Sequence, residues 1–211
     1  NYARTAKQIV EDMLGSPKTV SAGGGNAVGY WKFDEGADNT CSGGTNDACN
    51  SGSVGSALDG PQTGMAVPAT ATSGWTNSGK FNKALLFDGT GDYINIPTTA
   101  AVDITGNYTL SAWVRPAASN QDDKGIIAKW TTGSTGYMLF LASGVVRTYA
   151  NGTYAAGTTA LQANTWYHII GTYDGSNLRV YVNGFLEGTT AATSLTTDAG
   201  ALQLGTYNTR S

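Results

Sequence analysis

From Asn26 onward the chain is a series of short apolar segments separated by Gly, Asn and Asp, and this pattern constrains the fold more than any other feature. Gly, Asn and Asp tolerate the positive φ of tight turns, so the segments between them are predicted to be strands. The predicted strands are Ala27–Phe33, Ala84–Phe87, Tyr93–Ile96, Tyr108–Arg115, Gly125–Trp130, Tyr137–Ala142, Val145–Ala150, Trp166–Tyr173, Asn177–Val182, Phe185–Thr189 and Ala201–Gly205. Because no helical segment separates them, the series indicates an all-β, two-sheet antiparallel sandwich.

Alternation along the strands predicts which side chains share a face of a sheet. In the segment 108–115, one face carries Tyr108, Leu110, Ala112 and Val114, and the residues between them point the other way. We predict that three large aromatic residues fill the space between the two sheets, namely Trp113, Trp166 and Tyr181. Asp174-Gly175 and Asn183-Gly184 are predicted hairpin turns.

Residues 1–14 form the one segment with a convincing helical period. An apolar stripe that includes Ile9, Val10 and Leu14 lies opposite charged residues, and Gly15 and Pro17 end it. Residues 18–25 are predicted to be a flexible linker. We therefore divide the chain into a helix and linker at 1–25 and a sandwich at 26–211. The helix either folds back on its own sandwich or serves a partner.

Residues 37–80 lack strand periodicity and are predicted to form a long surface excursion. Cys41 and Cys49 lie within it, with no further Cys or His nearby to complete a zinc site. A disulfide that pins the loop is predicted, and two free thiols are the alternative. A disulfide would require an oxidising compartment.

The composition argues against several classes of partner. Charged residues make up 13% of the chain and the net charge is -3, so no basic field attracts a phosphate backbone and no nucleic acid partner is expected. No apolar stretch approaches the length of a membrane span. With a surface rich in Gly, Thr, Asn and Ser, the chain is predicted to be extracellular or at a cell surface, in the style of a prokaryotic protein.

Four segments in order give the chain a resemblance to the LamG-like jelly-roll family of the concanavalin A-like lectin/glucanase superfamily. They are 28–36 (VGYWKFDEG), 79–94 (GKFNKALLFDGTGDYI), 108–116 (YTLSAWVRP) and 166–175 (WYHIIGTYDG), the last continuing to YVNG at 181–184. The resemblance implies a jelly-roll sandwich and a non-catalytic extracellular module for binding or adhesion, which recognises a glycan or a protein.

Members of that family usually continue past a segment like Ala201–Gly205 into a closing strand that pairs with the first strand. Here the closing strand is expected to be absent, which would leave an open edge near Tyr30 that a neighbouring strand could join. Residues 1–14 also resemble the exposed lower part of a type IV pilin-like N-terminal helix. The alternative function is therefore a structural subunit of a surface filament or pilus, self-assembled through this edge.

Catalysis is not expected. Glycoside hydrolysis needs two carboxylates across the scissile bond, and none of the glutamates, such as Glu35 or Glu187, has an acidic neighbour at period-two spacing in a strand. The single histidine, His168, lies mid-strand, and no serine has a nucleophile motif around it. We interpret His168 as a packed strand residue.

Asp88 and Asp92 flank a glycine turn, where carboxylates and backbone carbonyls would suit calcium. Related modules often bind calcium, so the resemblance implies it as a cofactor. The alternative is that both aspartates cap the turn.

A sugar site needs aromatic faces beside amides or carboxylates. The predicted ligand-binding residues are Trp130, Tyr137, Tyr149, Tyr154 and Tyr207, with Asn151 and Gln203 as polar partners. Trp75, in the excursion, is the aromatic residue that a regular strand core explains least.

Overall fold

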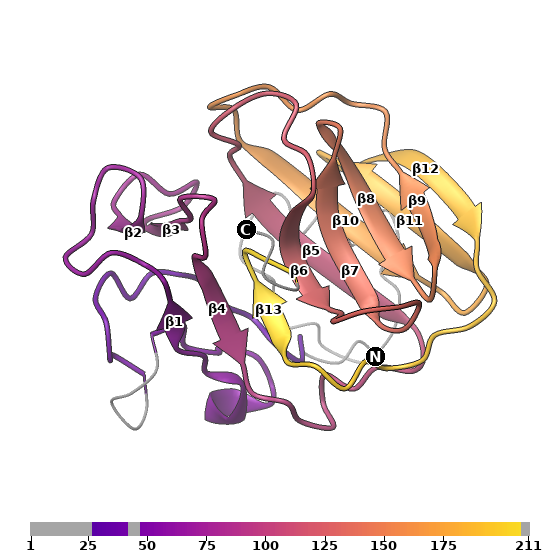
Figure 1. The fold of residues 1–211 in the computed structure, drawn as a ribbon, viewed down its shortest axis with the longest axis horizontal. Helices are drawn as coiled ribbons and strands as arrows, with labels where there is room; N and C mark the ends of the chain where they lie inside the picture. The colour runs from indigo at the N-terminus through magenta and orange to yellow at the C-terminus, as the bar shows by residue number, and fades with distance from the viewer. Residues whose placement is uncertain (1–26, 42–46, 208–211) are drawn as a thin grey trace.

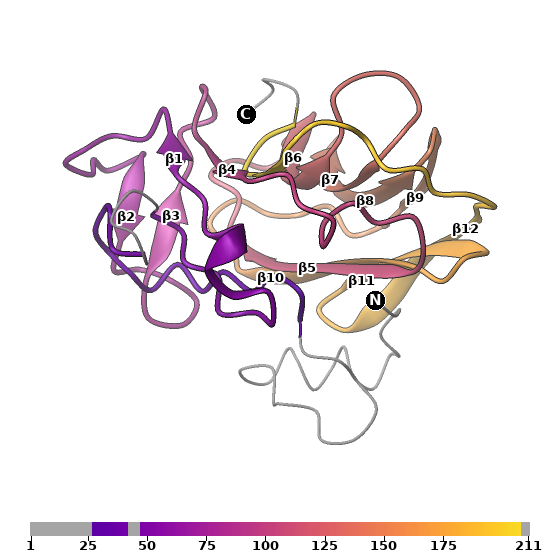
Figure 2. The ribbon, with the colours of Figure 1, turned by 90° about the horizontal axis from the view of Figure 1, so that it is seen from below.

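The computed structural model describes residues 27–41 and 47–207, which form two facing antiparallel sheets and a small third one (Figures 1 and 2). A seven-stranded sheet has the order β1-β4-β13-β6-β7-β8-β9, a four-stranded sheet the order β12-β11-β10-β5, and β2 pairs with β3. The elements are η1 (Gly55–Leu58), β1 (Gln62–Thr63), β2 (Gly74–Thr76), β3 (Ala84–Leu86), β4 (Tyr93–Ile96), β5 (Tyr108–Val114), β6 (Lys124–Lys129), β7 (Tyr137–Ala142), β8 (Val145–Ala150), β9 (Thr153–Ala156), β10 (Tyr167–Tyr173), β11 (Asn177–Val182), β12 (Phe185–Ala191) and β13 (Leu202–Leu204). The predicted all-β sandwich is confirmed. The helix predicted at 1–14 lies outside the described residues.

The interior lies between the large sheets and is lined by the inward face of each strand. Tyr108 stands near its centre, with its ring centroid 5.5 Å from that of Tyr137 and 5.9 Å from that of Tyr173. The Tyr108 hydroxyl donates to the carbonyl of Tyr149 at 2.9 Å, so its polar end is satisfied inside the core. Burial raises the pKa of the Tyr108 hydroxyl, which therefore stays protonated.

The prediction that Trp113, Trp166 and Tyr181 fill the space between the two sheets is wrong. Trp113 lies on the outer face of the four-stranded sheet and stacks on His168, with ring centroids 5.1 Å apart. Tyr181 packs with Ile170 in a separate cluster, and Trp166 is only partly buried. The reason is strand parity. Because Tyr108 and Leu110 point inward, Trp113 must point outward.

Predicted hairpin turns are confirmed where both central residues accept positive φ. Asn183 and Gly184 have φ of 49° and 84° and join β11 to β12. Gly175 also has positive φ, whereas Asp174 closes its turn by accepting hydrogen bonds from the backbone N–H groups of Ser176 and Asn177.

Residues 37–80 are more integrated than a surface excursion. They contain η1, β1 and β2, and they place Leu58 and Ala48 in the main core with no exposed surface. Trp75 packs against that core and donates its indole N–H to Asp38 at 3.0 Å. The segment therefore forms part of the sandwich, against the prediction of a loop without regular structure.

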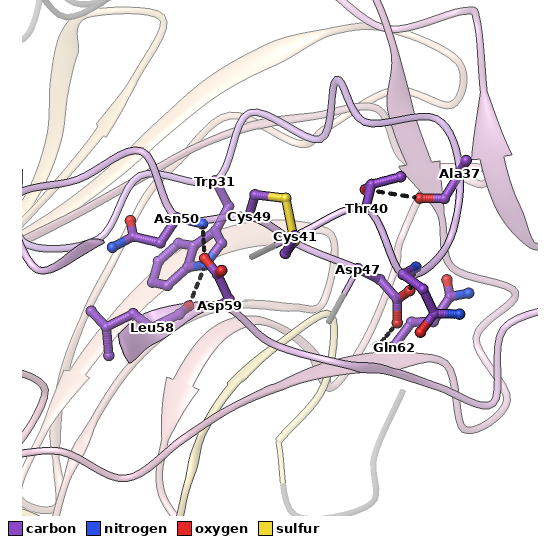
Figure 3. The surroundings of a disulfide bond; sticks show 11 residues. Trp31, Ala37, Thr40, Cys41, Asp47, Cys49, Asn50, Leu58, Asp59 and Gln62 are labelled. Carbon is purple, nitrogen blue, oxygen red and sulfur yellow. Dashed lines mark hydrogen bonds between the residues drawn. A yellow bond between two sulfur atoms is a disulfide. The ribbon is translucent and has the colours of Figure 1, made fainter. Parts of the chain in front are cut away.

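The disulfide predicted in this segment is present, and Figure 3 shows its surroundings. Cys41 and Cys49 are bonded with their Cα atoms 5.2 Å apart. Beside it, the indole N–H of Trp31 donates to the Leu58 carbonyl at 2.9 Å, and Asp59 accepts from the backbone of Asn50. The buried Asp59 carboxylate thus holds in place a segment whose backbone makes few hydrogen bonds to neighbouring strands.

The segment Ala27–Phe33 forms no strand of either sheet, contrary to prediction. Its backbone pairs with the chain's own residues 51–54, since Ser51 donates to the carbonyl of Tyr30 and Ser53 to that of Ala27. Trp31 makes one isolated bridge to Asn50. One side of the edge predicted near Tyr30 is thus occupied by residues 51–54, and self-assembly there stays a prediction.

A buried lysine stands where the loops after β6 and before β13 meet. Lys129 has no exposed surface, pairs with Asp103 at 3.0 Å and donates to the carbonyl of Gly200. Next to it, Asp198 accepts from Thr131 and from the Gly200 N–H. Burial acts to raise the pKa of Asp198, but these hydrogen bonds outweigh it and lower the pKa.

Candidate functional site

The outer face of the seven-stranded sheet carries one continuous row of side chains across six strands. The strand register places these residues directly beside one another, from β4 through β13, β6, β7 and β8 to β9. In that order the row is Asn95, Gln203, Ala128, Met138, Tyr149 and Tyr154. We call it the outer row. It is polar at one end and aromatic at the other, and between them Ala128 and Met138 are buried, so only the two ends are open to a ligand. Exposed aromatic rings and amides are the groups with which a sugar chain is bound.

An aromatic cluster lies against the centre of the outer row. Trp130 and Tyr207 meet edge to face with ring centroids 5.5 Å apart, and Phe140 meets Tyr207 at 6.2 Å. Trp130 donates its indole N–H to the carbonyl of Gly133 at 3.1 Å, which fixes the plane of its ring. Phe140 and Tyr207 are buried, whereas Trp130 is partly exposed, so Trp130 offers the accessible ring of this cluster.

The aromatic end of the outer row is the more open part. Tyr154 is 49% exposed, so its ring is accessible to a ligand. Tyr149 is directly opposite Tyr154 and is partly exposed. The guanidinium of Arg147 lies 4.8 Å from the Tyr154 ring centroid. Two tyrosine rings and a cation thus share one end of this face.

The structure brings together four of the five predicted ligand-binding residues. Trp130, Tyr149, Tyr154 and Tyr207 all lie on the outer face of the seven-stranded sheet. Tyr137 does not. It points into the core with 1% exposure and donates its hydroxyl to the Val102 carbonyl at 2.8 Å, so it cannot reach a ligand.

Of the two predicted polar partners, one lies on the same face of the seven-stranded sheet as these aromatic residues. Gln203 is in the outer row. Asn151 instead ties the β8–β9 turn to a loop, accepting from the backbone of Thr196 and donating to its hydroxyl. Sequence reasoning missed Asn95 and Arg147. Parity along the strand would have placed Arg147 on the same face as Tyr149, whereas the position of Asn95 beside Gln203 follows only from the pairing of β4 with β13.

Asp92 is the more unusual of the two aspartates predicted to bind calcium. It has no exposed surface, and its Oδ2 atom accepts from the Ser73 hydroxyl at 2.7 Å and from the backbone of Asp88 at 2.9 Å. Its Oδ1 atom is buried without a hydrogen-bond donor. Asp88 accepts from the backbone of Thr90 and so caps the turn. Across residues 27–41 and 47–207, no three His, Cys, Asp or Glu side chains gather as metal ligands would.

His168 is a packed residue, as predicted. It is 3% exposed, shares a 2.9 Å hydrogen bond between its Nε2 atom and the Ser111 hydroxyl, and has no partner at Nδ1. Burial lowers the pKa of His168 to about 4, so the ring is neutral at physiological pH. A triad would need a carboxylate at Nδ1 to orient the ring, and none lies there.

The sequence of the chain matches one known protein family. A profile of the concanavalin A-like lectin/glucanases superfamily matches residues 88–211. No curated protein sequence matches the chain. In the described part of the chain, no helix has the length and apolar character needed to cross a membrane.

Several solved structures are similar to the chain at low sequence identity. Domain 4 of AbnA, an extracellular GH43 arabinanase from Geobacillus stearothermophilus solved with arabinotriose, is 19% identical over 74% of this chain and 78% of its own, with a TM-score of 0.55. The carbohydrate-binding module CBM66 from Bacillus subtilis is 15% identical over 64% of this chain and 89% of its own, with a TM-score of 0.38. The binding domain of botulinum neurotoxin serotype C1 is 14% identical over 75% of this chain and 40% of its own, with a TM-score of 0.48. At this identity, the similarity to domain 4 of AbnA shows the fold alone.

Proposed function

Because the chain belongs to the concanavalin A-like lectin/glucanase superfamily, we propose that it is a non-catalytic module that binds glycans through its outer row. The observation that supports this most directly is the pairing of the partly exposed Tyr149 with the exposed Tyr154 at one end of the row, the other end of which carries amides. Sugar rings present C–H groups to aromatic faces and hydroxyls to amides, and this row offers both.

The proposed setting is outside the cell or at its surface. The Cys41–Cys49 disulfide supports it, because such bonds persist in oxidising compartments. Domain 4 of AbnA was solved with arabinotriose, and a neutral pentose oligosaccharide is therefore a sensible first probe alongside hexose polymers. The fold by itself carries no ligand identity.

Removing the exposed ring tests the proposed function. In the Tyr154→Ala variant we expect affinity for the bound glycan to fall about tenfold, because an exposed aromatic ring that stacks on a sugar carries much of the binding energy of a small site. Titration calorimetry against a panel of arabinan, galactan and glucan oligosaccharides measures it.

Phe185 offers a matched control, because it is 75% exposed and lies at the start of β12 in the other sheet. Phe185→Ala should bind like the unmodified protein. If Tyr154→Ala and Tyr149→Ala both bound every glycan normally while the protein itself bound one, the outer row would not be the site.

We also propose a structural calcium ion at Asp92. The buried Oδ1 atom without a donor supports this, because an orphaned carboxylate oxygen is costly unless a cation or a hydrogen bond compensates it. Asp88 and backbone carbonyls of the intervening glycine turn would supply further hard oxygen ligands. The ion would hold the turn before β4 and take no part in chemistry.

Calcium at Asp92 predicts a stability difference that depends on the ion. Millimolar calcium should raise the unfolding temperature by about 5 °C relative to a chelator, and Asp92→Asn should abolish the rise. Differential scanning calorimetry measures both. An identical unfolding temperature with calcium and with chelator would leave Asp88 and Asp92 as turn caps only.

A further inference from the structure

Arg147 occupies an unusual position for a charged residue on a sheet. It lies in β8 on the outer face of the seven-stranded sheet, opposite Phe140 on one side and Ala156 on the other. Neither neighbour can accept a hydrogen bond through its side chain. The guanidinium lies 4.8 Å from the ring centroid of Tyr154, which holds it beside the aromatic end of the outer row.

The Arg147 guanidinium has no hydrogen bond or ion pair to any residue in the described part of the chain, and its Nε atom is buried without a partner. By contrast, Arg179 is paired with Asp174, and the buried Lys129 with Asp103. Arginine carries five N–H donors and remains charged at any physiological pH. The partly buried N–H donors of Arg147, beside the Tyr154 ring, are therefore available to an acceptor on a ligand.

Two acidic side chains that contact the segments before β8 and after β9 have other roles. Glu187 accepts hydrogen bonds from the backbone N–H groups of Thr158 and Thr159 and from the Thr159 hydroxyl, so it fastens the chain after β9 to β12. Asp122 accepts from the backbone of Ser143 at the β7–β8 turn. Both carboxylates hold backbone in place, and neither forms an ion pair with Arg147.

We propose that Arg147 binds the carboxylate of an acidic sugar, such as a uronic acid, whose ring lies against Tyr149 and Tyr154. This inference rests on the proposed function and makes the ligand of the outer row an acidic glycan. A guanidinium matches a carboxylate through two parallel N–H···O bonds, which gives direction as well as charge. Contact with the Tyr154 ring fixes the guanidinium before the ligand arrives and reduces the entropy lost on binding.

The experiment compares two forms of one polymer that differ only in charge. Polygalacturonate carries a carboxylate on each sugar, and its methyl ester carries none. Affinity electrophoresis and calorimetry of the whole chain should show binding to polygalacturonate at least about tenfold tighter than to the ester, since a hydrogen-bonded charged group contributes on that scale. Sialylated and neutral lactose distinguish a sialic acid from a uronic acid as the source of the carboxylate.

Variants of Arg147 assign the preference to this side chain. Arg147→Gln should bind both polymers alike, and Arg147→Lys should keep part of the preference because it retains the charge without the fork. Arg115→Gln is the matched control. Arg115 is exposed, and its guanidinium lies 5.6 Å from the ring centroid of Trp166, away from the outer row. Its substitution therefore removes the same charge from a different site. It should leave the preference unchanged.

The outcomes separate this inference from the proposed function. If Arg147→Gln kept the preference for the acid form, or if Arg115→Gln abolished it equally, general charge would explain binding and Arg147 would have no such role. If the protein bound a neutral glycan through Tyr154 and ignored the acid form, the proposed function would stand and the acidic ligand would be wrong. Circular dichroism confirms that each variant is folded.

Discussion

Replacing Asp103 with alanine is expected to lower the free energy of unfolding by about 3 kcal/mol, the lower end of the range for breaking a buried ion pair. Lys129 has no exposed surface and keeps only the carbonyl of Gly200 as a partner once Asp103 is gone. An ammonium buried without a counter-charge is costly because it has lost its hydration. The lower end applies because the Asp103 side chain is 36% exposed, so water can enter in its place.

Urea unfolding at neutral pH measures this loss, and a double variant is its control. Lys129→Met removes the charge and leaves an apolar side chain of similar length in the core. In the combination Asp103→Ala with Lys129→Met, most of the stability lost in Asp103→Ala should return, because no charge then remains buried. Equal losses in Asp103→Ala and in the double variant would mean that Asp103 acts through packing or through its bond to Thr197 instead.

Acidification is expected to destabilise the fold through His168, by about 2.5 kcal/mol between neutral pH and about pH 4.5. The folded pKa of His168 is about 4 because burial disfavours the charged ring, whereas the unfolded value is 6.5. Between these values the unfolded chain binds a proton that the folded chain does not. The contribution of the neutral His168 ring to the free energy of unfolding is therefore fully present above pH 6.5 and is lost as the pH falls towards 4.

His168→Leu should remove this part of the pH dependence, because the variant has no ring to protonate. Unfolding by urea at both pH values, for the protein and the variant, measures the difference. The carboxyl groups are common to both proteins and cancel. His168 is the single histidine of the chain, so its proton resonance reports the folded pKa without ambiguity. A midpoint near 6.5 in the folded protein would contradict the prediction.

Strand positions were predicted well for several apolar segments that have Gly, Asn, Asp or Pro residues close by on both sides. Tyr93–Ile96, Tyr137–Ala142, Val145–Ala150 and Asn177–Val182 have the predicted bounds. The strand predicted at Ala27–Phe33 was wrong because its backbone finds partners in residues 51–54. β1, β2 and β9 were missed because two to four residues carry too little periodicity to be recognised.

The candidate site was predicted less completely, for a different reason. Tyr137 and Tyr149 look alike in sequence, since each is an aromatic residue in a strand flanked by turns. Tyr137 faces the core and Tyr149 faces outward, because β7 and β8 pair with Met138 opposite Tyr149. Arg147 drew no attention in the sequence, because the absence of a counter-ion can only be seen once the neighbouring strands are placed.

The sequence by itself determined the all-β sandwich, its turns and its disulfide, because these depend on residue types that are close together along the chain. Tertiary structure decided which face of each strand is buried and how the strands are ordered. That order assembled the outer row, because it placed β4 and β13, which are far apart in sequence, beside the consecutive strands β6 to β9. Such a row depends on strand register between distant segments, and local patterns of residues do not encode it.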